Sequence, residues 1–177
     1  PKIYPEPPPN LPVHAVPGCH FPQFAGSVRQ LLKLIQADLI YAVKPRATSL
    51  GIALLKKLYT HLPTLVDIDD WELSWLGGDR HKYKPTIRRL ARDIIRPDGA
   101  LRSPQHRFYL EWMEKLIPHT DGVTVNTEFL SSRFGGHYLP NGKDTILFDP
   151  LRFDPYLSRV KYGLADYRVL MFPGTLR

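Results

Sequence analysis

The chain has 177 residues and a hydrophobic fraction of 43%, which suits one globular domain, or one domain and part of another, and excludes an intrinsically disordered protein. It contains no run of about 18 uninterrupted apolar residues, which excludes a membrane-spanning helix. The single cysteine, Cys19, excludes an internal disulfide and favours a reducing compartment. We therefore expect a cytoplasmic protein, either free or associated with a membrane surface.

The formal net charge of +7 is concentrated in one segment, residues 80–107. Besides Asp93 and Asp98, this segment contains nine basic residues, which are Arg80, Lys82, Lys84, Arg88, Arg89, Arg92, Arg96, Arg102 and Arg107. Such a block predicts an anionic partner, which can be a phosphate-bearing substrate, a lipid surface or nucleic acid, although a solvated face has the same composition. Aromatic residues for base stacking are few here, so we expect no nucleic acid.

The first 24 residues are rich in proline, which disfavours helices, and only residues 11–16 are expected to form a short strand there. Beyond them, apolar residues at helical spacing alternate with short apolar runs that are typical of buried strands. In chain order, the expected elements are a helix at 26–36, a strand at 38–43, a helix capped by Thr48 or Ser49 and ending near residue 60, a strand at 63–68, helices at 86–95 and 104–116, a strand at 122–126, a helix at 128–134, a strand at 137–139, a helix at 155–162 and a strand at 168–172.

Strands that alternate with helices at this spacing predict an α/β fold with a Rossmann-like parallel sheet flanked by helices. The crossovers are expected to be right-handed, and the carboxyl ends of the strands are expected to form one crevice. Polar residues that follow strands are therefore the first candidates for a functional site.

Three polar clusters follow expected strands. In the first, Lys44 and Arg46 stand on a proline turn, where two cations can hold a phosphate or a carboxylate, or can simply solvate a loop. In the third, Asn126, Thr127 and Glu128 begin a short helix and offer free backbone donors to an anion, with a helix cap alone as the simpler interpretation.

The second cluster combines four carboxylates with a tryptophan, and consists of Asp67, Asp69, Asp70, Trp71 and Glu72. Carboxylates at this density suit general acid–base catalysis or oxygen ligation of a divalent metal, and tryptophan faces stack on sugars. In the simpler interpretation, Asp70 caps a helical turn and Trp71 belongs to the core. We take Asp69 and Asp70 as the catalytic candidates and expect no bound metal.

The expected helix at 86–95 is amphipathic. Its apolar face consists of Ile87, Leu90, Ala91 and Ile94, and arginines occupy most of the other positions. A basic amphipathic helix suits binding to anionic lipid headgroups, and it equally suits a surface helix whose apolar side packs on the sheet.

Five segments, in their order and spacing, resemble glycosyltransferase family four, whose members have the GT-B fold. The segments are 37–45, 64–72, 120–126, 138–144 and 169–175. The most specific one contains Leu139-Pro-Asn-Gly-Lys-Asp144, which is similar to the Pro-Asn-Gly-Val-Asp stretch before the family's interdomain linker. Together the segments extend over nearly the whole chain.

The resemblance implies two facing Rossmann-like domains with a nucleotide-sugar donor between them, and transfer of the sugar to a hydroxyl of a glycan or lipid acceptor. The donor is a substrate, and no cofactor is expected. This chain would then hold an incomplete N-terminal, acceptor-side domain at 1–147, an interdomain linker and helix at 148–166, and the first strand of the donor-binding domain at 167–177.

The resemblance also implies roles for individual residues. Gly174 and Thr175 would face the donor diphosphate. The residues expected on the acceptor side, besides Asp69 and Asp70, are Lys44, Arg46, Trp71, Glu72 and Asn126.

Several features depart from the family pattern. Its first strand and glycine-rich loop would precede Pro1, and the glutamate pair that grips the donor would follow Arg177. Thr175 stands in place of the arginine in the family's Gly-Arg pair, Lys143 replaces an apolar residue, and Tyr41 stands where a histidine is frequent. We therefore expect a piece of a larger enzyme that is inactive alone.

Two other interpretations stay open. Another Rossmann-like nucleotide-dependent enzyme, such as an epimerase, would need a glycine-rich phosphate loop after its first strand. A basic binding module, or a degenerate remnant of an enzyme, would dock on an anionic membrane through residues 80–107.

Overall fold

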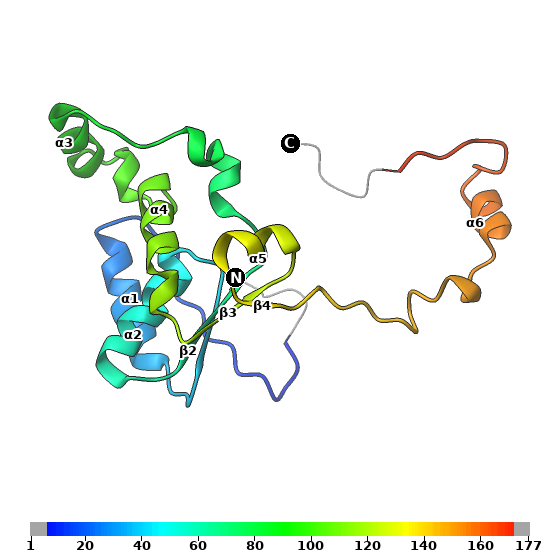
Figure 1. The fold of residues 1–177 in the computed structure, drawn as a ribbon, viewed down its shortest axis with the longest axis horizontal. Helices are drawn as coiled ribbons and strands as arrows, with labels where there is room; N and C mark the ends of the chain where they lie inside the picture. Colours follow the sequence, from blue (N-terminus) through cyan, green and yellow to red (C-terminus); the bar gives the residue numbers. More distant parts are fainter. Residues whose placement is uncertain (1–6, 172–177) are drawn as a thin grey trace. The chain divides into compact units, whose positions relative to one another are not determined.

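The computed structural model of the chain describes residues 7–171 (Figure 1). The chain divides into two compact units, with the boundary between Pro140 and Asn141. The first unit contains the parallel sheet and most of the helices, and the described part of the second, residues 141–171, contains one α-helix.

The sheet of the first unit has four parallel strands in the order β1-β2-β3-β4. The strands are β1 Ile40–Val43, β2 Thr64–Ile68, β3 Gly122–Val125 and β4 His137–Tyr138. Each lies within a run that the sequence predicts as a strand. The parallel sheet and its helices confirm the predicted Rossmann-like α/β fold.

The α-helices follow the expected order, and none within residues 7–171 is long and apolar enough to cross a bilayer. They are α1 Gln23–Leu34, α2 Ile52–Thr60, α3 Ile87–Ile95, α4 Arg107–Leu116, α5 Glu128–Phe134 and α6 Pro155–Lys161. The expected cap of α2 is wrong, because a π-helical turn at Ala47–Gly51 precedes this helix. The Arg46 carbonyl accepts from the Ser49 N–H at 3.0 Å, so the helical turn already encloses Thr48 and Ser49.

The helices that contact the sheet lie on one of its faces. Right-handed crossovers that advance in one direction across a parallel sheet produce this arrangement. The buried core on this face consists of Ala42, Leu50, Ala53, Val66, Ile68, Ile117, Val125 and Leu130. It joins the first three strands to α2 and α5 (Figure 1).

The opposite face of the sheet carries a row of polar contacts. The Tyr41 hydroxyl and Thr124 Oγ1 lie 2.8 Å apart, and Thr124 Oγ1 donates to Asp67 Oδ1 at 2.6 Å. Tyr41 and Val43 on this face are 46% and 51% exposed. The hydrogen bonds connect β1, β2 and β3 from the side that the core does not occupy.

The structure shows no strand in residues 11–16, nor in residues 168–171, the described part of the strand expected at 168–172. Residues 11–16 have no regular structure, because Pro12 within the segment and Pro17 directly after it lack the backbone donor that a sheet needs. Residues 168–171 also have no regular structure. A strand requires a hydrogen-bonded neighbour, and the sheet found in the described part of the chain ends at β4.

The second unit is held mainly by local hydrogen bonds. Asp154 caps α6, and its Oδ1 accepts from the Tyr156 N–H at 2.8 Å and from the Leu157 N–H at 3.0 Å. None of residues 141–171 is buried. Its stability therefore depends little on apolar packing within the unit.

Candidate functional site

The segment after β1 places two cations at the carboxyl edge of the sheet. Lys44 adopts a left-handed backbone φ of 71°, which is uncommon outside glycine, and its N–H donates to the Asp67 carbonyl at 2.8 Å. The Arg46 N–H donates back to the Lys44 carbonyl at 2.9 Å. The chain thus turns tightly around the buried Pro45, at the end of the neighbouring strand β2.

The side chains after β1 and β2 meet in one ion cluster, which consists of Lys44, Arg46, Asp69, Asp70 and Glu72. The Lys44 ammonium lies 3.1 Å from Asp69 Oδ1 and 3.2 Å from Asp70 Oδ2. It also lies 3.3 Å from Glu72 Oε1, and Arg46 Nη2 lies 2.6 Å from Glu72 Oε2. The structure therefore brings together five residues that the sequence places in the candidate site.

Glu72 is the buried centre of this ion cluster. Its side chain is 6% exposed, whereas that of Lys44 is 26% exposed. Burial acts to lower the pKa of Lys44, but the hydrogen bonds to Asp69 and Asp70 outweigh it and raise this pKa above its ordinary value. Lys44 therefore stays charged across the neutral range and fixes the surrounding carboxylates.

The ion cluster suits hydroxyl groups better than free anions. Its two cations already face three carboxylates of the chain itself, so no excess positive charge is left for a phosphate. The side chains of Asp69 and Asp70 are 38% and 49% exposed. Asp69 Oδ1 is buried beside the Lys44 ammonium, so it is the other carboxylate oxygens that can accept hydrogen bonds from a sugar hydroxyl. Residues 7–171 contain no group of three His, Cys, Asp or Glu side chains placed to hold a metal.

Other residues that the sequence places in the candidate site lie outside the ion cluster. Asp67 accepts a hydrogen bond from Thr124 on the face of the sheet opposite the buried core. Asn126 follows β3, and its Oδ1 is buried with no hydrogen-bond partner among the described residues. Thr127 caps α5, and its Oγ1 accepts from the Leu130 N–H at 3.2 Å, a contact that both interpretations of this cluster include.

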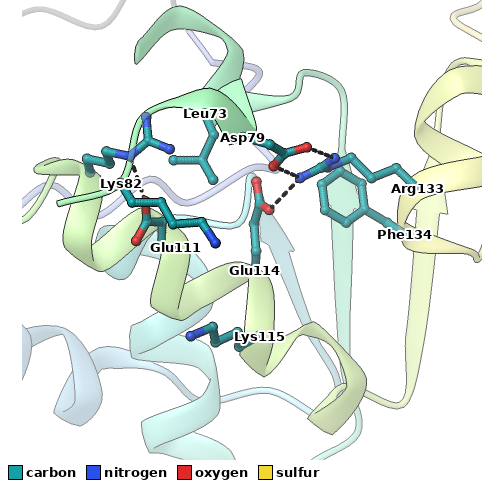
Figure 2. A pocket seen from close by; sticks show the side chains of 9 residues that line it. Leu73, Asp79, Lys82, Glu111, Glu114, Lys115, Arg133 and Phe134 are labelled. Atoms are coloured by element: carbon teal, nitrogen blue, oxygen red, sulfur yellow. Dashed lines mark hydrogen bonds and ion pairs between the residues drawn. The ribbon is translucent and has the colours of Figure 1, made fainter. Parts of the chain in front are cut away.

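Trp71 belongs to a second cluster, which Figure 2 shows in part. Its indole N–H donates to Glu114 Oε1 at 3.0 Å, and the Arg133 guanidinium carbon lies 4.1 Å from the centre of its ring. Arg133 also forms a bidentate ion pair with Asp79, with N···O distances of 2.8 and 2.9 Å (Figure 2). The guanidinium thus occupies one face of the indole, where a sugar would otherwise stack.

A cavity of about 470 Å³ lies among these charged side chains (Figure 2). On its wall, the buried Arg107 donates to the carbonyls of Leu76 and Gly78, at 2.7 and 2.6 Å, and to Glu111 at 2.6 Å. The two carbonyls belong to the 3-10 helices Glu72–Leu76 and Gly78–Arg80. Arg107 therefore fastens the segment after β2 to α4.

Burial raises the pKa of the Glu114 carboxyl above its ordinary value, and the nearby Arg133 guanidinium only partly opposes this effect. The hydrogen bonds from Arg133 lower the pKa of Asp79, which is largely exposed. Apart from Arg107, which the sequence places in the basic segment 80–107, sequence reasoning missed these residues. Only the Arg107–Glu111 pair has the i,i+4 spacing by which a helix pair is recognised in a sequence.

Comparison of the chain with protein-family models, curated proteins and solved structures gives no match. The two residues expected to face the donor diphosphate, Gly174 and Thr175, lie outside the described residues. The candidate site is therefore defined by the ion cluster at the carboxyl edge of the sheet.

Proposed function

We propose that this chain forms the acceptor-binding side of a GT-B glycosyltransferase, which transfers a sugar from a nucleotide-sugar donor to an acceptor hydroxyl. The observation that carries the proposal is the ion cluster at the carboxyl edge of a parallel sheet, where α/β enzymes bind their ligands. The resemblance to glycosyltransferase family four adds support, because its first three segments contain β1, β2 and β3.

In this proposal, Asp69 and Asp70 act on the acceptor. A half-exposed carboxylate accepts the hydrogen bond of an acceptor hydroxyl and raises the electron density on the oxygen that attacks the sugar. Lys44 lies within 3.2 Å of both carboxylates and holds them in place. Glu72 is a positioning residue, because its buried carboxylate contacts both Lys44 and Arg46.

Two further residues take different parts. Asn126 stays assigned to the acceptor side at the end of β3, although its Oδ1 is buried and has no hydrogen-bond partner among the described residues. Trp71 is assigned to the support of the segment after β2, since Arg133 covers its ring and Glu114 holds its N–H. The donor diphosphate would be bound mainly by the second domain of a GT-B enzyme.

The proposal is tested by the binding of neutral sugars to the full chain, measured by saturation-transfer NMR and titration calorimetry. We expect weak binding that falls at least about tenfold in Asp69→Asn and in Asp70→Asn, which corresponds to about 1.4 kcal/mol. Asp98→Asn is the matched control, because Asp98 is exposed and lies outside the ion cluster. If no sugar binds, or if both cluster variants bind like the wild type, the acceptor assignment is wrong.

A further inference from the structure

The orientation of α3 reverses that of an ordinary surface helix. Its only buried residue is an acid, Asp93, which is 2% exposed. The Tyr83 hydroxyl donates to Asp93 Oδ2 at 2.8 Å, Arg92 Nη2 lies 3.1 Å from Oδ1, and Arg89 Nε lies 3.6 Å from Oδ2. The polar side of α3 therefore faces the protein.

The apolar side of α3 faces outward. Ile87 and Ile95 are 88% and 75% exposed, and Ile94 is 55% exposed. Figure 1 shows α3 at the edge of the first unit, away from the sheet. The alternative in which this helix packs its apolar side on the sheet is therefore wrong, because the Asp93 contacts fix the opposite orientation.

The exposed surface of α3 is ordered in parallel stripes, because residues four apart lie above one another on a helix. One apolar stripe contains Ile87, Ala91 and Ile95, and a second contains Leu90 and Ile94. On the other side of the first stripe lies a basic stripe, which consists of Arg88, Arg92 and Arg96; Arg92 also pairs with Asp93, so Arg88 and Arg96 are the main basic contacts offered to lipid. All of these side chains except the three arginines are apolar, and none of the eight is buried.

We propose that α3 is a docking surface for an anionic lipid bilayer. A helix of this kind can bury its aliphatic side chains at the boundary between headgroups and acyl chains, while its arginines contact lipid phosphates. Lys82 and Lys84, which are exposed just before α3, extend the positive charge. An anionic bilayer offers phosphates to the arginines and an apolar phase to the exposed isoleucines. An acidic protein surface would match only the arginines, so these side chains favour a membrane.

The proposal is tested by co-sedimentation of the full chain with vesicles of phosphatidylcholine alone and of equimolar phosphatidylcholine and phosphatidylglycerol. Binding is expected to the anionic vesicles only. It is expected to weaken strongly at about 1 M salt, where the Debye length falls to about 3 Å. Failure to bind the anionic vesicles at low salt would overturn the proposal, as would equal binding to both kinds of vesicle.

Two pairs of variants separate the contributions of charge and apolarity. Arg88→Glu with Arg96→Glu should weaken partitioning by at least about 25-fold, since each basic residue near an anionic surface contributes roughly fivefold. The matched control is Arg29→Glu with Lys33→Glu, two exposed cations on α1 that should have a much smaller effect. Equal losses in the two pairs would show that net charge alone acts and would refute a role of α3.

Ile87→Ser with Ile95→Ser should weaken partitioning at least about tenfold, because the side chains no longer enter the apolar phase. The matched control is Ile146→Ser with Leu151→Ser, which removes side chains that are 72% and 93% exposed in the second unit. Thermal unfolding should stay unchanged in both pairs, because all four positions are exposed. The wild type could instead form a dimer, fail to bind vesicles, and lose the dimer when Ile87→Ser and Ile95→Ser are introduced. This result would assign the α3 surface to a second copy of the chain and overturn the proposal.

A depth probe gives a readout that unfolding does not imitate. Because Cys19 is the single cysteine, Cys19→Ser with Ile95→Cys can carry an environment-sensitive fluorophore at one site. Its emission should shift to the blue with anionic vesicles, whereas the same label on Arg29→Cys should not respond. An unchanged emission at position 95 would place α3 outside the bilayer and refute the proposal.

Discussion

Replacing Glu72 by glutamine should destabilise the first unit by about 2 kcal/mol. The substitution keeps the shape of the side chain but removes a charge that is 6% exposed and that contacts Arg46 at 2.6 Å and Lys44 at 3.3 Å. Breaking a fully buried ion pair costs about 3–5 kcal/mol. The cations here are 34% and 26% exposed, so water replaces part of the lost interaction and the smaller value is expected.

The assay is urea unfolding of the full chain, followed by tryptophan fluorescence and circular dichroism, with Asp98→Asn as a surface control within about 0.5 kcal/mol of the wild type. Arg46→Gln and the double variant complete a cycle. The two substitutions should be non-additive by about 1 kcal/mol or more, because the partners are in contact. A loss below about 0.5 kcal/mol for Glu72→Gln, or additive effects, would refute the reasoning that Glu72 holds the cations.

Three other changes have defined outcomes. In a complete transferase that contains this chain, Asp69→Asn or Asp70→Asn should lower turnover by more than about tenfold, or 1.4 kcal/mol, and near-normal turnover in both would remove them from the site. Arg107→Met should lower the free energy of unfolding by about 2–3 kcal/mol, because the Leu76 and Gly78 carbonyls lose a charged hydrogen-bond donor. A urea-unfolding midpoint equal to that of the wild type would contradict this. The raised pKa of Glu114 favours the protonated form in the folded state, so its contribution to stability is present below the unfolded pKa of about 4.3 and is lost as pH rises through the folded pKa. Unfolding of Glu114→Gln across this range should therefore show a smaller loss of stability with rising pH than the wild type, and parallel curves would be the contrary result.

The fold could be predicted from the sequence because its elements are marked locally. The helix at 128–134 has the predicted bounds, since Thr127 is a standard cap and a glycine follows Phe134. The ion cluster was predictable because parallel strands end at one edge, which brings Lys44 near Asp69. Both inferences need only local sequence and a general rule of α/β topology.

The orientation of side chains could not be predicted in the same way. The spacing of Ile87 and Ile94 defines an apolar face on α3, but the direction of that face depends on the contact between Tyr83 and Asp93. Trp71 is similar, because its partner Glu114 is 43 residues away in the sequence. Contacts between residues so far apart depend on how whole segments pack, which local periodicity does not encode.

The connection between β2 and β3 contains both the catalytic candidates and the proposed docking helix. It runs from residue 69 to residue 121, far beyond the dozen or so residues that a parallel crossover needs, and it contains Asp69 and Asp70 at one end and α3 in its middle. Arg107 fastens the segment after β2 to α4, so α3 is inserted between two anchored parts of the same connection. A bilayer bound by α3 would hold the first unit at the surface that carries lipid-linked acceptors.

This arrangement predicts a selective effect on the complete transferase. Ile87→Ser with Ile95→Ser should lower turnover of an acceptor embedded in anionic vesicles about tenfold or more, because the enzyme no longer partitions to the surface that carries it. Turnover of a water-soluble acceptor with the same sugar should be unchanged, since both isoleucines are exposed and neither belongs to the ion cluster. Steady-state rates with both acceptors, compared with Ile146→Ser and Leu151→Ser, measure this difference. If the variant loses the same fraction of its turnover on both acceptors, α3 supports the site structurally. If the variant turns over both acceptors as fast as the wild type, membrane docking by α3 does not contribute to catalysis.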